Sequence, residues 1–256
     1  ELDMWFFNII KKGWEKFVRT IQQEKQDLVK ALTKQLSGLK VPEVIIKESI
    51  KEFHINPLTW EDKDLFKLAS KLRRKTKPMI IAANKIDIPE SASSLERLKK
   101  EFPNYLIIPC SGDSELALRE ASKSNLIEYI PGSSDFKILK DLSEQQRKAL
   151  NYIKENVLNK YNSTGVQEIL NKAVFDLLKC IAVFPGGVNK LSDSEGRILP
   201  DCYIMPPNST AIDFAFKLHT DLGNNFIRAI NVKTKQVIGR DYILKHRDVI
   251  EIVTKK

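Results

Sequence analysis

Residues 84–87, Asn-Lys-Ile-Asp, carry the side chains best suited to chemistry, and they follow the apolar run Met-Ile-Ile-Ala-Ala at 79–83. A short continuous apolar run predicts a strand buried on both faces, and open parallel sheets bind ligands where such strands end. At that edge the Asp87 carboxylate can accept two parallel hydrogen bonds, from N1–H and N2–H of a guanine base. Adenine lacks these donors and would leave a buried group unpaired, at a cost of roughly 1–3 kcal/mol. The Asn84 amide can bond to the base edge or brace the neighbouring loop, and the Lys85 stem can lie along the ring.

A second loop, Cys-Ser-Gly at 110–112, follows another predicted buried strand at 105–109. A small residue at Ser111 or Gly112 lets a backbone N–H approach the O6 atom of guanine. One strand–helix–strand step separates the two loops, and this spacing favours joint recognition of one base. Ordinary turn chemistry is the alternative for the first loop, and a helix cap is the alternative for Ser111.

The elements that must position these loops alternate between strand and helix. Helices are predicted at about 91–102 and 115–123, one after each strand, and this order predicts a parallel sheet. Two strands are too few for a stable doubly wound sheet, so we expect part of this fold to lie on the amino-terminal side. Two further helices are predicted at about 143–159 and 163–178, the second capped by polar residues at 162–165.

The first 77 residues are predicted to form a helical, coiled-coil-like arm. Apolar residues recur at steps of three to five over residues 4–36, which predicts one long amphipathic helix that stops at Gly38. A second helix is expected at 43–53, after Pro42. A third is expected to be capped by Thr59 and to end before Pro78.

The last 76 residues have a different texture, with short strand-like pieces and a single helix predicted at 213–222. Turns are predicted at 185–187 and 193–196. One helix among four or five short strands predicts a small α+β domain of the β-grasp type. The expected strands are 181–184, 204–205, 226–232, 236–238 and 249–253.

Charge is distributed unevenly along a chain whose formal net charge is +9. Lys and Arg exceed Asp and Glu by 17 to 11 in residues 1–77 and by 11 to 8 in residues 181–256, whereas residues 78–180 carry 14 of each. A basic surface favours phosphate backbones such as RNA, although a solvated Lys-rich surface has the same composition.

Composition disfavours several classes of protein. No run approaches the ~18 apolar residues that a membrane span needs, and the first residues do not form a signal peptide. The three cysteines are isolated in sequence, so we expect no disulfides, no metal site and a reducing, cytoplasmic location. No set of His, Asp and Ser residues suggests nucleophilic catalysis. The chain does not begin with Met, and we expect it to be the interior of a longer protein.

Several segments resemble one family of nucleotide-binding proteins. Residues 78–87 resemble the guanine-specificity segment of translation-factor-related GTPases, and residues 108–112 resemble their second base-binding segment, with Gly112 in place of the usual Ala. Residues 126–132 and 163–168 resemble archaeal proteins of the Obg/YchF type. Residues 207–216, 219–223 and 248–252 resemble a TGS domain, with Arg247 in place of the usual Gly before Asp248.

This resemblance implies an α/β and α+β multidomain fold. Residues 1–77 would be a helical arm inserted in a P-loop-type G domain, residues 78–180 the carboxyl-terminal half of that domain, and residues 181–256 the TGS domain. Obg-like ATPases of this group carry an altered base motif, so the intact motif ending at Asp87 implies GTP or GDP as the ligand. The family implies a ribosome- or RNA-associated regulator of translation. The alternative is a non-catalytic module that binds RNA or protein through the arm and the TGS domain.

One expected feature is absent from the sequence. The pattern Gly-x-x-x-x-Gly-Lys-Ser/Thr, whose backbone and Lys hold nucleotide phosphates and whose hydroxyl binds Mg²⁺, does not occur. Phosphoryl transfer depends on positioning and neutralising those phosphates. We therefore assign no catalytic residue and expect this chain not to hydrolyse GTP. A full-length family member would be a GTPase, with Mg²⁺ bound by the phosphate-binding half.

Overall fold

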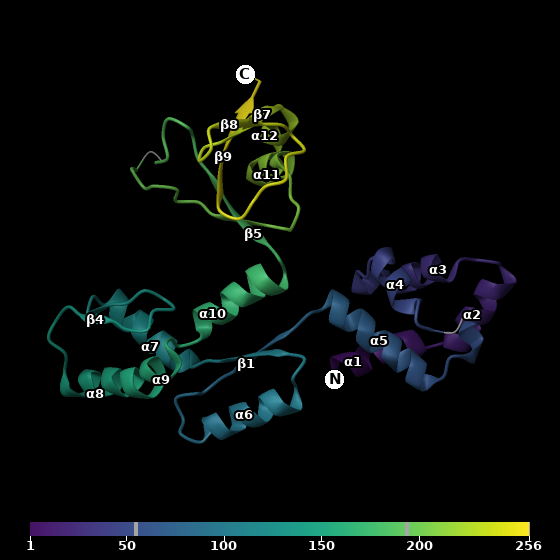
Figure 1. Ribbon diagram of the computed structural model, residues 1–256, viewed down its shortest axis with the longest axis horizontal. Helices are drawn as coiled ribbons and strands as arrows, with labels where there is room; N and C mark the ends of the chain where they lie inside the picture. The colour runs from purple at the N-terminus through teal and green to yellow at the C-terminus, as the bar shows by residue number, and fades with distance from the viewer. Residues whose placement is uncertain (54–55, 193–194, 256) are drawn as a thin grey trace. The chain divides into compact units, whose positions relative to one another are not determined.

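The computed structural model describes residues 1–53, 56–192 and 195–255 (Figure 1). The chain divides into two units, Glu1–Met79 and Ile80–Lys256.

Helices are the only regular secondary structure among the described residues of the first unit. Its buried apolar side chains form one core that includes Phe6, Ile10, Leu32, Ile46 and Leu68. Its helices are α1 (Leu2–Lys11), α2 (Trp14–Gln23), α3 (Leu28–Gln35), the 3₁₀ turn η1 (Ser37–Leu39), α4 (Glu43–Ile50), the 3₁₀ turn η2 (Pro57–Thr59) and α5 (Asp62–Thr76).

The single helix predicted over residues 4–36 is wrong, because this segment forms three helices. Gly13 and Lys25 adopt φ angles of 73° and 52° between them, and a left-handed residue cannot continue a right-handed helix. The apolar periodicity persists across both breaks because each short helix buries its own stripe in the same core. The segment also ends differently, since Lys40 (φ 54°), and not Gly38, is the left-handed residue.

The other arm helices differ from the prediction at their ends. Helix α4 ends at Ile50, three residues before the predicted end at 53. Helix α5 begins with a capping box in which Glu61 and Asp64 bond reciprocally to backbone N–H groups, so the predicted cap at Thr59 is wrong. Thr59 instead belongs to η2 and donates its hydroxyl to the Asn56 carbonyl at 2.8 Å.

The second unit begins with the strand–helix–strand–helix order that was predicted. Strands β1 (Ile80–Ala83) and β2 (Leu106–Pro109) pair in parallel, which confirms the parallel sheet. The expected burial on both faces is wrong, because Ala82 is exposed and Leu106 is 45% exposed. This sheet has only two strands among the described residues, so each strand has an open edge. Helix α6 (Ser91–Glu101) connects the strands, and α7 (Gly112–Lys123) follows them.

A helical region with its own apolar core follows. It begins with a short antiparallel pair that the sequence analysis missed, β3 (Ile127–Glu128) and β4 (Lys137–Ile138). The second predicted helix of this region begins with α10, whose N-cap is Gly165 (φ 77°), within the predicted capping segment 162–165; no side-chain hydrogen bond caps it. The helices are α8 (Glu144–Ile153), the π-helical segment η3 (Lys154–Leu158), α9 (Asn159–Tyr161), α10 (Val166–Asn171) and the π-helical segment η4 (Lys172–Leu177).

The last part of this unit is a five-stranded mixed sheet in the order β6-β5-β9-β7-β8, which confirms the predicted α+β character. Helix α11 (Ala211–Leu218) lies beside this sheet (Figure 1). Its Phe214 is fully buried in the core of the sheet. The single helix predicted at 213–222 is wrong, since His219 separates α11 from α12 (Thr220–Asn224). Part of the predicted turn at 193–196 lies outside the described residues. The strands are β5 (Ile181–Pro185), β6 (Tyr203–Met205), β7 (Phe226–Asn231), β8 (Gln236–Ile238) and β9 (Asp248–Thr254).

No helix in the described part of the chain combines the length and the apolar character that crossing a membrane requires. The cysteines are free: Cys110 is buried, Cys180 is partly buried and Cys202 is exposed. Within the same residues, no cluster of three or more His, Cys, Asp and Glu side chains could hold a metal ion.

Candidate guanine-recognition site

The two loops predicted to carry the site meet at the carboxyl edge of the β1–β2 pair. Ala83 and Pro109 are register partners at the ends of these strands. The ladder continues past them, because the Cys110 N–H donates to the Ala83 carbonyl at 2.9 Å and the Ile86 N–H donates to the Cys110 carbonyl at 3.2 Å. Parallel pairing therefore places residues 84–87 beside residues 110–112.

Side chains bind the two loops to each other. Asn84 Oδ1 accepts hydrogen bonds from the Gly112 N–H at 3.1 Å and from the Lys85 N–H at 2.8 Å. The Ser111 hydroxyl donates to Asp87 Oδ1 at 2.8 Å. The structure thus brings all five predicted residues, Asn84, Lys85, Asp87, Ser111 and Gly112, into one small region.

Exposure differs among these residues in a way that suits recognition. Ser111 is buried and caps α7 by accepting a hydrogen bond from the Ser114 N–H, so the capping role and the contact with Asp87 coexist. Asp87 is half-buried, and an ionised carboxylate has about four lone-pair sites, so one bond from Ser111 leaves acceptor capacity. Lys85 is exposed and has a φ of 67°, which turns the chain sharply after the strand.

Two contacts to these loops come from residues that the sequence analysis did not identify. The Tyr152 hydroxyl on α8 donates to the Asp87 carbonyl at 2.8 Å, and the Ser111 N–H donates to the Thr164 carbonyl at 2.9 Å. Tyr152 is 65 residues from Asp87 in the chain. No local pattern reports a contact of that separation, so only the fold could reveal it.

Cys110 is the first residue of the second loop, and it is buried. Burial raises the pKa of its thiol, which keeps it protonated and unreactive at neutral pH. Its sulfur lies 3.9 Å from Asn84 Oδ1, so it packs behind the amide that joins the loops.

Comparison with known proteins identifies the family. Residues 82–187 match the domain described as Obg-like GTPase YGR210-like, G4 motif-containing, and residues 194–254 match the TGS domain. The crystal structure of a GTP binding protein from Pyrococcus horikoshii OT3 is 41% identical, with a TM-score of 0.71; the match covers 100% of this chain and 69% of that one. The chain belongs to the Obg-like, YchF-type family of GTP-binding proteins.

Two curated family members are also similar over most of the chain. The uncharacterized GTP-binding protein MJ1332 of Methanocaldococcus jannaschii is 49% identical over 257 residues, which cover 99% of this chain and 64% of that protein. The uncharacterized GTP-binding protein C428.15 of Schizosaccharomyces pombe is 30% identical over 224 residues, which cover 82% and 54% respectively. This chain therefore spans less than two thirds of the length of either relative.

The structure shows the setting of the two residues that depart from the expected family patterns, Gly112 and Arg247. A Cβ atom added at Gly112 would lie 3.8 Å from Asn84 Oδ1, an ordinary contact, so Gly and Ala fit equally well at this position. Arg247 stands where Gly was expected and has a φ of 67°. A left-handed conformation favours glycine, so Arg at this position carries a backbone cost of about 1–2 kcal/mol.

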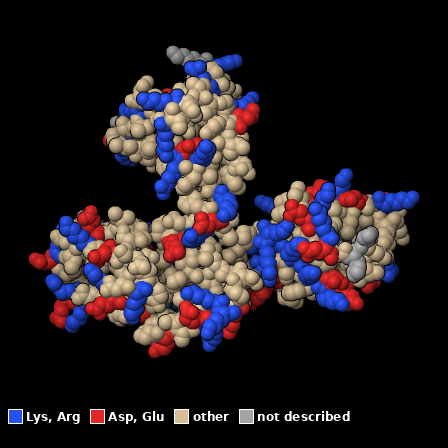
Figure 2. Space-filling view, viewed as in Figure 1, with Lys and Arg blue, Asp and Glu red and all other residues tan. Residues whose placement is uncertain are grey.

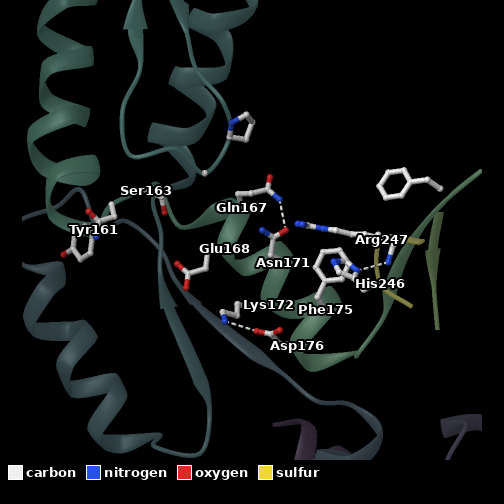
Figure 3. Close-up of a pocket in the computed structure, with 15 residues that line it drawn as sticks. Tyr161, Ser163, Gln167, Glu168, Asn171, Lys172, Phe175, Asp176, His246 and Arg247 are labelled. Carbon is white, nitrogen blue, oxygen red and sulfur yellow. Dashed lines mark hydrogen bonds and ion pairs between the residues drawn. The ribbon is translucent and has the colours of Figure 1, made fainter. Parts of the chain in front are cut away.

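A separate cleft of about 800 Å³ lies beside η4 and contains none of the five predicted residues (Figure 3). Its charges are largely matched within the wall, because Lys172 Nζ lies 2.8 Å from Asp176 Oδ2. The His246 ring is fixed by a 3.1 Å hydrogen bond that its Nδ1 accepts from the Ala182 N–H and by edge packing on Phe175. This cleft offers polar groups of both signs and selects no single ligand chemistry.

Proposed function

We propose that residues 84–87 and 110–112 bind the guanine base of GTP or GDP. The observation that carries this proposal is the pair of contacts between the loops, Ser111 Oγ to Asp87 Oδ1 at 2.8 Å and Gly112 N to Asn84 Oδ1 at 3.1 Å. These contacts hold the Asp87 carboxylate, an acceptor, and the Asn84 amide at the same strand edge. Membership of a family of GTP-binding proteins supports the same ligand.

Each residue has a separate task in this proposal. The lone pairs of Asp87 that Ser111 does not use accept N1–H and N2–H of the base. The Lys85 stem covers one face of the ring. The N–H groups of Ser111 and Gly112, which were predicted to approach O6, donate to the Thr164 carbonyl and to Asn84 Oδ1 in this structure, so the donor to O6 is assigned to the Asn84 amide. Asn84 braces the two loops through Oδ1, and its Nδ2 donors suit the O6 and N7 acceptors of the base.

Base recognition can be tested without the nucleotide phosphates. In amide NMR titrations, GMP is expected to shift the signals of Ser111 and Gly112, whereas AMP is not. Asp87→Ala should abolish the GMP response. Asp87→Asn replaces one carboxylate oxygen with an amide NH₂ donor. The response should then transfer to XMP, whose C2 carbonyl accepts a hydrogen bond. Asp141→Ala, which removes an exposed carboxylate elsewhere, is the matched control.

A wild-type chain that responds equally to GMP and AMP at millimolar concentration would contradict guanine recognition. The same conclusion would follow if Asp87→Ala and Asp141→Ala responded alike.

We propose the family's domain arrangement for the longer protein, with residues 1–77 as an arm inserted in the G domain, residues 78–180 as part of that domain and residues 181–256 as the TGS domain. The 256-residue chain lacks the phosphate-binding pattern, so we expect no GTP turnover from it. A longer protein with that pattern would bind Mg²⁺ and act as a GTPase. A malachite-green assay for phosphate release, run on both proteins, checks this; turnover by the 256-residue chain would refute it.

A role in translation through RNA is the second proposal, and exposed cations around β7 and β8 support it. Arg228, Lys233, Lys235 and Arg240 are all exposed there. In the first unit, by contrast, Lys and Arg side chains interleave with Asp and Glu (Figure 2), and pairs such as Lys75–Glu48 use several of its cations. We therefore propose that RNA contacts the TGS domain rather than the arm.

Fluorescence anisotropy with a single-stranded RNA tests the RNA proposal. Affinity should fall as the salt concentration rises. The double change Lys233→Gln and Lys235→Gln should lower the slope of log affinity against log salt concentration by the equivalent of roughly two phosphate contacts. Lys99→Gln, which removes a cation paired with Glu96 on α6, should leave it unchanged. Binding that does not respond to salt would exclude a backbone contact.

A further inference from the structure

A buried carboxylate lies directly behind the loop that holds Ser111. The Glu115 side chain on α7 is 5% exposed. Its Oε1 accepts a hydrogen bond from Arg119 Nε at 2.6 Å, and its Oε2 accepts hydrogen bonds from the hydroxyls of Tyr129 at 2.8 Å and Thr164 at 2.5 Å. One carboxylate thus joins α7, the segment after β3 and the segment before α10.

Two of the three donors to Glu115 are buried. Thr164 is 0% exposed and Tyr129 is 7% exposed. Burial by itself would raise the pKa of Glu115, but the hydrogen bonds from Thr164, Arg119 and Tyr129 outweigh it and hold the pKa below its ordinary value. The cluster therefore contains an ionised carboxylate. An apolar side chain of the same volume at this position would cost less desolvation free energy.

Thr164 connects this carboxylate to the base loop through its backbone. Its carbonyl accepts the Ser111 N–H at 2.9 Å, while its hydroxyl bonds to Glu115. The next residue, Gly165, has a φ of 77°, and a Cβ atom there would lie 1.9 Å from the Pro109 carbonyl oxygen. Residues 164–165 therefore lie in close contact with the backbone that leads into Ser111.

A continuous path of contacts results, from Asp87 through the Ser111 hydroxyl and the Ser111 N–H to Thr164, and on to Glu115. Each step is shorter than 3 Å, and Ser111, Thr164 and Glu115 are all buried. Displacement of Thr164 would displace the Ser111 backbone, and with it the partner of the Asp87 carboxylate.

We propose that Glu115, Thr164 and Tyr129 form a positioning cluster that holds the Ser111 loop in the geometry for guanine. This inference rests on the proposed function, and it adds positioning residues that touch no part of the base. Its distinctive consequence is local: the Ser111 loop, rather than the fold as a whole, loses order when the cluster is broken.

Thr164→Val is the most direct test, because it removes the hydroxyl and keeps the volume and the carbonyl. The loss of one buried charge-assisted hydrogen bond should raise the Kd for GMP roughly fivefold to thirtyfold. The Kd is measured in samples that are more than about 95% folded. The amides of Ser111 and Gly112 should exchange with solvent faster by a similar factor, while those of β7 and β9 should not change. Thr164→Ser retains the hydroxyl and should restore wild-type binding and exchange.

Tyr129→Phe removes a different donor from the same carboxylate and should act in the same direction, which keeps the test decisive if Thr164→Val does not fold. The proposal is overturned if these variants fold, bind GMP as wild type does and keep wild-type exchange at Ser111 and Gly112. If the wild-type chain binds no GMP, the proposed function fails, and the exchange rates alone decide whether the cluster holds the loop. Faster exchange spread evenly over the unit would show a merely structural role and would overturn it too.

Discussion

Two sheets of the second unit, the β1–β2 pair and the five-stranded sheet, achieve order by different means. The five-stranded sheet has an apolar core in which Val183, Phe214 and Ala229 are 0% exposed. The β1–β2 pair leaves Leu106 45% exposed, and its carboxyl edge is held by polar contacts such as Ser111 to Asp87. A two-stranded sheet is marginal without further packing, so contacts from distant segments must fix its loops. The proposed site thus lies on the sheet that depends more on hydrogen bonds than on an apolar core.

The largest expected effect comes from Gly165→Ala, which attacks the contact behind the β1–β2 loops. A Cβ atom 1.9 Å from the Pro109 carbonyl oxygen forces the backbones apart, so the free energy of unfolding should fall by more than about 4 kcal/mol. Gly13→Ala is the matched control, since Gly13 is also left-handed (φ 73°) but no atom lies within 4 Å of its added Cβ. It should cost only about 1–2 kcal/mol. Equal losses in urea unfolding would refute the close contact.

Phe214→Ala should cost about 3–5 kcal/mol, because it leaves a cavity in the core of the five-stranded sheet. Hydrogen exchange is expected to accelerate in β5, β7 and β9 and to stay unchanged at Ser111 and Gly112. If the loop amides lost protection in parallel, the two sheets would form a single cooperative element, and the contrast between them would fail.

Glu115→Gln should cost about 1–3 kcal/mol, because it removes the charge that accepts hydrogen bonds from Thr164, Tyr129 and Arg119. The pKa of Glu115 is lowered in the folded chain, so its ionised form contributes stability above its unfolded pKa of about 4.3. That contribution is lost as the pH falls through the lower, folded pKa. Urea unfolding between about pH 6 and pH 3 should therefore show a shallower acid-dependent loss in Glu115→Gln than in wild type. Identical pH profiles would mean that Glu115 is not ionised in the fold.

Gly112→Ala should have the smallest effect, and a stabilising one. The position is the first residue of α7, and the added Cβ meets Asn84 only at 3.8 Å, so a gain of about 0.4–1 kcal/mol is expected from the less flexible unfolded chain. Thermal unfolding measures the gain, and the GMP titration should be unchanged. A marked loss of GMP binding would indicate that the base approaches this backbone more closely than a methyl group allows.

Much of the fold could be predicted because it depends on local patterns. The apolar runs predicted both parallel strands, and the short strand-like pieces after residue 180 predicted a small α+β domain. Helix continuity could not be predicted, because apolar periodicity reports which faces are buried and not whether the backbone is continuous. Gly13, Lys25 and His219 each interrupt a pattern that remains periodic on both sides of the break.

The sequence by itself determined that Asn84, Lys85, Asp87, Ser111 and Gly112 would meet, because parallel strands end at the same edge and one helix spans the step between them. Only the tertiary structure decided what holds them there. Tyr152 is 65 residues from Asp87, and Thr164 is 49 residues from Glu115, with which it shares a hydrogen bond. Such contacts depend on how helices pack after the chain has collapsed, and no spacing within the chain encodes that packing directly.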